Sequence, residues 1–461
     1  QFLKYMSTKI YPKVLIFSQS FNKFSGGGIT LTNLFSGWPK ERIAVMTYNF
    51  MMVGVSTEIC NTYYQLGKEE IHWKFPFSFI KEKPKSGLLN DTELFPKKSG
   101  RSEKYKNQKS IGFLFNLLIK LLGLNHFQSS ISISELLKAW LIKYRPELLY
   151  FQISNRESIN FARNLIEYLR IPSVLHMMDD WPSSIADESI FRSYWKKKIG
   201  NELQQLMNKV DLNLSICDEM SDEYKRRYGH EFHSFHNTID IEKWMPFVRK
   251  DVSLSRGTKS ILFSGRIGKG IQQSLIELAE AVDSLRSEGV DIKLNIQSPR
   301  SEPKTLDQIR RYECVTINPP VEYDRIPELY SKADILVIAN DFNPGGIKFL
   351  KFSMPTKAPE FMISGTPILV YASSETAVYK LFHINKCGYC VSKQSKKAIA
   401  DAIRLLLQDS GYRETLSKNA ITYAQVNFDS LIVRQRFQDL LIRSAKSFED
   451  KTSASNNYRP L

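Results

Sequence analysis

Short apolar runs alternate with segments of helical periodicity along most of the chain, and this alternation constrains the fold more than any other feature. A short apolar run is typical of a strand that is buried on both faces, and a helix usually connects it to the next parallel strand. The alternation therefore predicts an α/β fold with parallel sheets covered by helices. In the first half we expect strands at Lys13–Ser18, Leu148–Gln152, Ser173–His176 and Leu212–Ile216, and helices at Ile29–Phe35, Ile159–Leu169 and Lys196–Met207.

The alternation stops once and then restarts, which indicates two domains. The segment Ile241–Thr258 contains Pro246, mixed charges and a polar stretch, as expected of a linker. The sequence thus predicts two Rossmann-like domains facing a cleft, at residues 10–245 and 259–427, followed by an amphipathic helix at 428–446. In the second domain we expect strands at Ser260–Phe263, Lys293–Ile296, Cys314–Ile317, Ile335–Ile338 and Pro367–Tyr371.

The composition is that of a globular protein with an acidic partner. Of the 461 residues, 42% are hydrophobic and 24% are charged, as in ordinary globular domains. No apolar stretch approaches the ~18–20 residues of a membrane-spanning helix. The net charge of +16 favours nucleic acid, an anionic membrane or a phosphate-bearing substrate as partner. Residues 1–12 contain no apolar core of signal-peptide length, so we expect a cytoplasmic location.

One region of the first half does not fit the α/β scheme. Residues 81–109 carry nine basic and four acidic side chains among prolines and glycines, which favours a solvated loop. The segment 111–122 follows directly, and as a helix it has only one narrow polar stripe. It is either a buried helix of the first domain or a helix that lies in a membrane interface beside the basic loop. The second alternative predicts peripheral contact with the inner face of a membrane.

The turn Ser264–Gly270 follows a predicted strand and precedes a predicted helix. Glycines at such a turn let the backbone approach a ligand, and the N-terminus of the helix favours anions. Arg266 and Lys269 add two cations to the same edge. This arrangement suits a diphosphate, although a short glycine-rich turn alone is a weak signal and occurs for structural reasons as well.

The segment Lys351–Pro367 is the second candidate for phosphate binding. We expect a short helix with Ser353, Thr356 and Lys357 in its first turn, where hydroxyl and ammonium groups bind phosphate well. Glu360 follows about one turn later. A carboxylate beside a phosphate site is explained if it accepts hydrogen bonds from sugar hydroxyls, such as a ribose diol. The alternative is a capped surface helix with a Lys–Glu pair.

Taken in order, these stretches resemble the glycosyltransferases of the GT-B fold, family 4 group. The resemblance covers most of the chain between residues 13 and 444. It implies a C-terminal helix that crosses back to the first domain. The matching stretches are GGGITLTNLF (26–35), SICDEMSDEYKRRYG (215–229), HNTIDIEKW (236–244), SGRIGKG (264–270), LYSKADILVIA (329–339) and PTKAPEFMISGTPIL (355–369).

The resemblance implies an activity and a set of site residues. A hexose would move, with retention of configuration, from a nucleoside diphosphate sugar to a surface-glycan or lipid-linked saccharide acceptor. The donor would be a UDP-sugar rather than a GDP-sugar, and no metal or other cofactor would be required. Arg266 and Lys269 would bind the diphosphate and Glu360 the ribose. The remaining residues of the expected donor site are Gly27, Gly28, Ser353, Thr356 and Lys357.

In the first domain, relatives place a His-Asp pair at the end of a strand, facing the acceptor. Here the aligned pair is Met178-Asp179, with His176 two residues earlier. His176 and Asp179 are therefore candidate catalytic residues. A histidine in an apolar strand end is more often structural, and the adjacent pair Asp179-Asp180 could also hold a divalent cation.

The second domain departs from the family in one important position. Relatives often carry two glutamates eight positions apart; Glu360 matches the second, but Phe352 stands at the first. The loop before it, Asn340–Leu350, contains Asp341, which could supply the missing contact to the donor sugar. Asp341 is therefore the third candidate catalytic residue.

Two other functions remain open on the sequence alone. The same fold could serve a nucleotide-sugar epimerase or a phosphorylase. A nucleic-acid-binding protein would explain the charge, but the chain contains no recognisable DNA- or RNA-binding motif, so nucleic acid is not expected as a partner.

Overall fold

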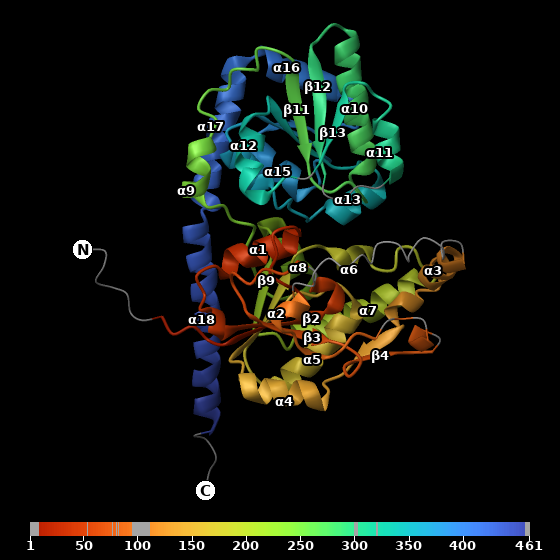
Figure 1. Cartoon of the computed structure of the whole chain (residues 1–461), viewed down its shortest axis with the longest axis vertical. Coiled ribbons are helices and arrows are strands. Elements are labelled where there is room, and N and C mark those ends of the chain that lie inside the picture. Colours follow the sequence, from red (N-terminus) through yellow and green to blue (C-terminus); the bar gives the residue numbers. More distant parts are fainter. Residues whose placement is uncertain are drawn as a thin grey trace, which may run out of the picture. The chain divides into compact units, whose positions relative to one another are not determined.

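The structure is a computed structural model, and it describes residues 9–456 except 53, 76, 80, 82, 95–110, 299–302 and 320. The chain divides into two compact units. Unit 1 contains residues 1–235 and 434–461, and unit 2 contains residues 236–433. The prediction of two α/β domains with parallel sheets is confirmed (Figure 1).

Unit 1 is built on an eight-stranded sheet in the order β10-β9-β8-β7-β1-β2-β3-β5. All neighbouring strands are parallel except β3 and β5. The central strand β1 is wholly buried, as expected for a strand with helices on both faces. The strands are β1 (Val14–Phe17), β2 (Ile43–Tyr48), β3 (Thr62–Leu66), β5 (Gly87–Leu88), β7 (Leu148–Phe151), β8 (Ser173–Met177), β9 (Leu212–Ser215) and β10 (Phe232–Ser234).

Helices and a small second sheet complete unit 1. The strands β4 (Ile71–Trp73) and β6 (Ser129–Ile131) form an antiparallel pair outside the main sheet. The helices are α1 (Gly26–Phe35), α2 (Asp91–Leu94), α3 (Ile111–Leu121), α4 (Glu135–Tyr144), α5 (Arg156–Leu169), α6 (Trp181–Ser184), α7 (Arg192–Met207) and α8 (Asp218–Tyr228).

The last helix, α18 (Ser430–Asn456), begins in unit 2 and returns to unit 1. Its Phe437 ring lies 5.2 Å from the ring of Phe35 and 6.1 Å from that of Tyr150, measured between centroids. Its Gln438 amide donates to the backbone carbonyls of Leu34 (3.3 Å) and Ser36 (3.0 Å) at the end of α1. α18 is therefore part of the core of unit 1, although it follows all the elements of unit 2 in the sequence.

Unit 2 is built on a six-stranded parallel sheet in the order β13-β12-β11-β14-β15-β16. The strand order reverses between β11 and β14, and ligands of such open sheets bind at the carboxyl ends of the strands beside this reversal. The strands are β11 (Lys259–Ser264), β12 (Ile292–Gln297), β13 (Val315–Asn318), β14 (Ile335–Ala339), β15 (Ile368–Tyr371) and β16 (Tyr389–Val391).

Helices cover the sheet of unit 2, with α10 packed against α11 and α16, and α14 packed against α17. Figure 1 shows α10 and α11 along one side of β11–β13. The helices are α9 (Ile241–Trp244), α10 (Gln272–Ser287), α11 (Pro303–Ile309), α12 (Ile326–Ser331), α13 (Pro344–Leu350), α14 (Ala358–Ile363), α15 (Ala377–Ile384), α16 (Lys396–Gln408) and α17 (Ser410–Asn427).

Candidate active site

The glycine turn of unit 2 lies at the carboxyl end of β11, beside the reversal of strand order. Gly265 has φ +144° and Gly270 has φ +87°, both in the region that side chains disfavour. Arg266 and Lys269 are exposed, and the Lys269 ammonium lies 5.2 Å from the centroid of the Phe349 ring on α13. The turn therefore presents two cations to solvent from a backbone that only glycines allow.

The side chain of Lys357 contacts the backbone of this turn. Its ammonium donates to the backbone carbonyl of Ser264 and lies over the rings of Phe263 and Phe361, 4.8 and 5.8 Å from their centroids. A Cβ atom at position 265 would overlap this ammonium, so the lysine side chain would have to move. Burial lowers the pKa of Lys357 to about 8.

Glu360 lies on α14 and is buried, with only 5% of its surface exposed. Its carboxylate accepts a hydrogen bond of 3.0 Å from the hydroxyl of Tyr323, which comes from the 3-10 turn η7 (Tyr323–Arg325). Burial raises the pKa of Glu360 to about 7, against the smaller opposing effects of Tyr323 and Lys357. Tyr323 was not singled out from the sequence, because nothing in the spacing connects it to Glu360.

The sequence predicted Ser353 and Thr356 in the first turn of a helix, and this prediction is wrong. α14 begins at Ala358, with Lys357 as its N-cap residue, so both side chains belong to the connection from α13. The Ser353 hydroxyl donates to the Phe349 carbonyl (3.3 Å), and the Thr356 carbonyl accepts from the Asn237 amide (2.9 Å). The helix starts late because Pro355 and Pro359 limit where a helical hydrogen bond can form.

Asp341 is buried and caps a helix, which argues against the expected contact with the donor sugar. Its carboxylate accepts a hydrogen bond of 2.8 Å from the backbone N–H of Ser274 in the first turn of α10. Its own backbone N–H donates to the Gly270 carbonyl at 2.7 Å. Asp341 thus joins the glycine turn to the start of α10. Burial raises the pKa of its carboxyl group.

In unit 1 the three glycines form the first turn of α1 and not a loop before it. The Ser25 side chain caps this helix by accepting from the Gly28 backbone N–H at 3.1 Å. A Cβ atom at Gly28 would overlap the Asn22 side chain, and one at Gly27 would lie 2.8 Å from Oε1 of Gln19 and 3.4 Å from Oε1 of Gln152. These two amide side chains follow β1 and β7, and nothing in the sequence connects them to the glycines.

His176 is structural in this arrangement, contrary to its candidate catalytic role. It is wholly buried within β8, and its two ring nitrogens lie 2.6 Å from the Tyr150 hydroxyl and 3.3 Å from the Ser215 carbonyl. Burial lowers its pKa to about 4. A neutral imidazole with both nitrogens engaged inside the sheet has no exposed atom for an acceptor.

The two adjacent carboxylates after β8 have different surroundings. Asp180 is buried and accepts two hydrogen bonds from the Arg227 guanidinium, at 2.8 and 3.0 Å, and one from the Tyr224 hydroxyl at 3.0 Å. Those contacts occupy the carboxylate, so a shared cation site with Asp179 is not supported. Asp179 is exposed and remains the candidate of this segment that a substrate could reach.

Part of this chain is similar to known proteins. Residues 258–409 match the model of the family "Glycosyl transferases group 1". The D-inositol 3-phosphate glycosyltransferase of Xylanimonas cellulosilytica is 24% identical over 240 residues, which cover 48% of this chain and 54% of that protein. The chain therefore spans about half the length of the curated relative it matches.

Solved structures share the whole fold. Sucrose-phosphate synthase from Thermosynechococcus elongatus matches with a TM-score of 0.60 at 14% identity, over 93% of this chain and 97% of that chain. HepE from Anabaena, in complex with UDP-glucose, matches with a TM-score of 0.60 at 13% identity, over 94% and 99%. The fold is that of the GT-B glycosyltransferases. This fold and the match to the group 1 family together support a glycosyltransferase activity for this chain.

Proposed function

We propose that this chain moves a hexose from a nucleoside diphosphate sugar to a saccharide or lipid-linked acceptor, with retention of configuration, as a member of the GT-B family 4 group. The observation that carries the proposal is the cluster at the carboxyl end of β11. There Arg266 and Lys269 are exposed on a glycine turn, and Lys357 binds the same turn from below. The UDP-glucose bound to HepE favours UDP over GDP as the nucleotide.

The chemistry assigned to this cluster is stabilisation of the leaving diphosphate. Two exposed cations and the backbone N–H groups of the turn neutralise negative charge as it develops, so no metal is needed for that step. Glu360, fixed by Tyr323, accepts hydrogen bonds from the ribose diol. Its two oxygens suit a pair of neighbouring hydroxyl groups.

Unit 1 would bind the acceptor. Gln19 and Gln152 lie beside the first turn of α1 and offer amide groups to sugar hydroxyls. Asp179, exposed after β8, is the carboxylate we assign to the acceptor side. These assignments take the place of those of His176 and Asp341. Of the three side chains only Asp179 is exposed, whereas Gln19 and Gln152 are each 8% exposed.

Thermal unfolding with nucleotides tests the donor site. UDP, GDP and ADP, each with its glucose derivative, are added at equal concentration to the full chain. At a ligand concentration of 100 Kd the native state gains about 2.7 kcal/mol. This gain raises the melting temperature of a unit of this size by about 5–11 °C. We expect the largest rise with UDP and UDP-glucose; no rise with any nucleotide would contradict the proposal.

Incubation with UDP-glucose alone distinguishes a transferase from an epimerase, which would yield an altered sugar nucleotide.

A membrane contact through α3 is the second part of the proposal. Leu117, Leu118 and Leu121 are 42%, 55% and 36% exposed, whereas Ile119 is buried, which favours a surface position for this part of α3. Next to it are Ile190 and Phe191, 67% and 52% exposed, whose segment donates a backbone hydrogen bond of 2.8 Å to the Leu121 carbonyl. Exposed apolar side chains on two adjoining segments suit the interface of a bilayer.

The basic segment 81–109 would add electrostatic attraction, since each cation near an anionic surface contributes ~1 kcal/mol. Its residues 82 and 95–109 lie outside the described part of the chain. No described helix has both the length and the apolar character that crossing a membrane requires. We therefore propose peripheral attachment to the inner face of a membrane, beside a lipid-linked acceptor.

Liposome flotation tests this attachment. We expect the full chain to float with anionic vesicles at low salt, and Leu117→Glu with Leu118→Glu to prevent it. Ile384→Glu with Val426→Glu is the matched control, because these side chains are 70% and 65% exposed in unit 2 and the change in charge is identical. Failure of the unaltered protein to float, or equal flotation of both variants, would exclude α3 as the contact.

A further inference from the structure

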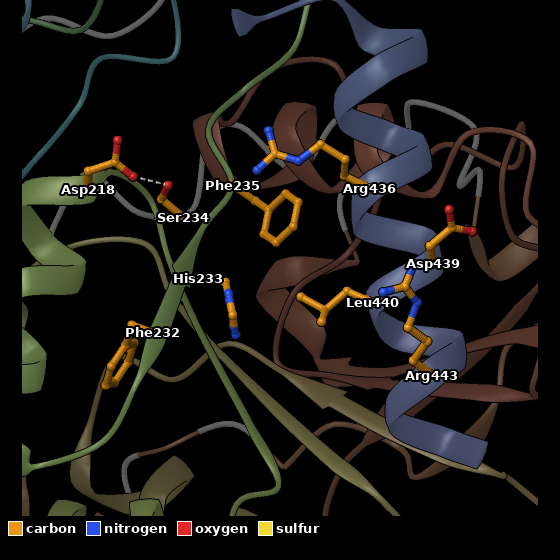
Figure 2. Close-up of a pocket in the computed structure, with 9 residues that line it drawn as sticks. All are labelled: Asp218, Phe232, His233, Ser234, Phe235, Arg436, Asp439, Leu440 and Arg443. Atoms are coloured by element: carbon orange, nitrogen blue, oxygen red, sulfur yellow. Dashed lines mark hydrogen bonds between the residues drawn. The ribbon is translucent and has the colours of Figure 1, made fainter. Parts of the chain in front are cut away.

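A hollow of about 450 Å³ lies in unit 1 between the edge strand β10 and the helix α18 (Figure 2). None of the residues that line it belongs to the donor or acceptor site described above. β10 pairs only with β9 in the main sheet, so its outer edge has no strand partner among the described residues. The volume is within the range of sites for small molecules.

Two arginines of α18 border this hollow. Arg436 and Arg443 are seven residues apart, so they lie on the same side of the helix about 10 Å apart along its axis. Both are exposed, and within the described part of the chain neither guanidinium has a carboxylate or other hydrogen-bond acceptor. Figure 2 shows Arg436 extending away from α18 across Phe235.

Asp439 lies between the two arginines but does not neutralise them. It is three residues after Arg436 and four before Arg443, which is the usual spacing for ion pairs on a helix. Its carboxylate is instead paired with the ammonium of Lys9, at 2.7 Å. The other carboxylate at the hollow, that of Asp218, accepts a hydrogen bond from the Ser234 hydroxyl. Both acidic groups thus have partners, while the arginines do not.

The opposite wall and the floor are apolar or uncharged. Phe235 is buried and its ring packs 5.3 Å from that of Phe437, which fixes β10 against α18. Figure 2 shows the ring of His233 and the side chain of Leu440 on opposite sides of the hollow. A ligand here would place its carbon skeleton against Phe235 and Leu440 and an anionic group between the arginines.

We propose that this hollow is a binding site for a small phosphate monoester, such as a sugar phosphate. Each guanidinium donates to the tetrahedral phosphate group, whose oxygens accept hydrogen bonds from two directions at once. The imidazole of His233 is a further donor at the rim. The limited volume and the paired carboxylates disfavour an extended nucleic acid or an acidic peptide.

Arginine labelling locates the ligand without any substitution. Phenylglyoxal modifies exposed guanidinium groups, and peptide mass spectrometry assigns the modified positions. The full chain is treated with phenylglyoxal in the presence of saturating UDP, which occupies the proposed donor site. Glucose 6-phosphate should slow labelling of Arg436 and Arg443 at least fivefold and leave that of Arg311, an exposed arginine of unit 2, unchanged. Inorganic phosphate should protect as well, since the phosphate is the recognised group.

Three outcomes of the labelling would overturn the proposal. Equal protection by uncharged glucose would show that the phosphate is not recognised. Protection by anionic vesicles but not by glucose 6-phosphate would assign the arginines to a membrane surface. No protection by either glucose 6-phosphate or inorganic phosphate would show that the hollow does not bind a phosphate group.

Calorimetry with variants provides the affinity. Arg436→Gln with Arg443→Gln should weaken binding of glucose 6-phosphate at least tenfold, because two charge-assisted hydrogen bonds are lost. Lys143→Gln with Lys418→Gln removes the same charge from exposed positions elsewhere and should change nothing. Both variants should keep the affinity for UDP, so failure here would not affect the proposed donor site. Unchanged affinity in the arginine variant would refute the assignment.

Discussion

Replacement of Asp341 by alanine distinguishes a structural carboxylate from one that contacts the donor sugar. In the structure the carboxylate caps α10 through the backbone N–H of Ser274 and is itself buried. Alanine removes the acceptor and leaves the first turn of α10 without it. Asparagine retains an oxygen in the same place. We expect Asp341→Ala to lower the stability of unit 2 and Asp341→Asn to recover most of the loss.

The size of the effect can be estimated in two ways from the one hydrogen bond that is lost. Loss of a helix cap costs about 0.5–2 kcal/mol. A buried backbone N–H group without an acceptor costs about 1–3 kcal/mol. We therefore expect a destabilisation of about 2 kcal/mol, which for a unit of this size lowers the melting temperature by roughly 4–8 °C.

Thermal unfolding followed by circular dichroism measures this shift, and turnover of UDP-glucose is measured in parallel at a temperature where every variant is folded. If Asp341→Ala melts with the unaltered protein but loses turnover, the carboxylate contacts substrate and the assignment as a helix cap is wrong. If Asp341→Asn is as unstable as Asp341→Ala, the negative charge rather than the hydrogen bond is what α10 requires.

Three further predictions concern the donor site. Arg266→Ala should leave the fold intact and weaken UDP binding by about 10–100-fold in calorimetry, since a hydrogen bond to a charged group contributes about 1.5–3 kcal/mol; unchanged affinity would contradict the assignment of the glycine turn. Glu360→Gln should keep its bond from Tyr323 and its melting temperature but lose UDP affinity to a similar extent, and equal kinetics with every donor would make Glu360 purely structural. Affinity for UDP-glucose should rise with pH as Glu360 ionises near its raised pKa of about 7 and fall again as Lys357 loses its proton near its lowered pKa of about 8. In the Glu360→Gln protein only the alkaline decline should remain, and a flat profile between pH 6 and 9 in the unaltered protein, values about one unit beyond both pKa values, would refute the roles of both groups.

The sequence predicted the α/β architecture because burial on both faces leaves a direct mark on each central strand. The run Leu148–Gln152 appears as β7 (Leu148–Phe151), and Ile335–Ile338 appears as β14 (Ile335–Ala339). Edge strands leave a weaker mark. The strand β10 has three residues and one exposed side chain, and its periodicity is too short to recognise.

The candidate site could be predicted only where local spacing determines it. Arg266 and Lys269 follow from the turn itself, whereas Tyr323 reaches Glu360 from 37 residues away and Asp341 caps a helix that starts 69 residues earlier. The sequence does not show whether the carboxylate of a loop residue binds a sugar or accepts a hydrogen bond from a backbone N–H group. The same limit applies to His176, because the groups that engage its two ring nitrogens lie on the neighbouring strands β7 and β9.

The position of α18 in the chain affects how the protein is made. Its Phe437 completes the core around Phe35 and Tyr150, and its Gln438 caps the end of α1. These partners leave the ribosome early, but α18 follows only after all of unit 2, about 200 residues later. At a synthesis rate of about 5–20 residues per second, the first unit waits roughly 10–40 s with an uncovered apolar surface. Unit 2 is contiguous and can fold first, so unit 1, whose strands are synthesised before unit 2, is completed after it.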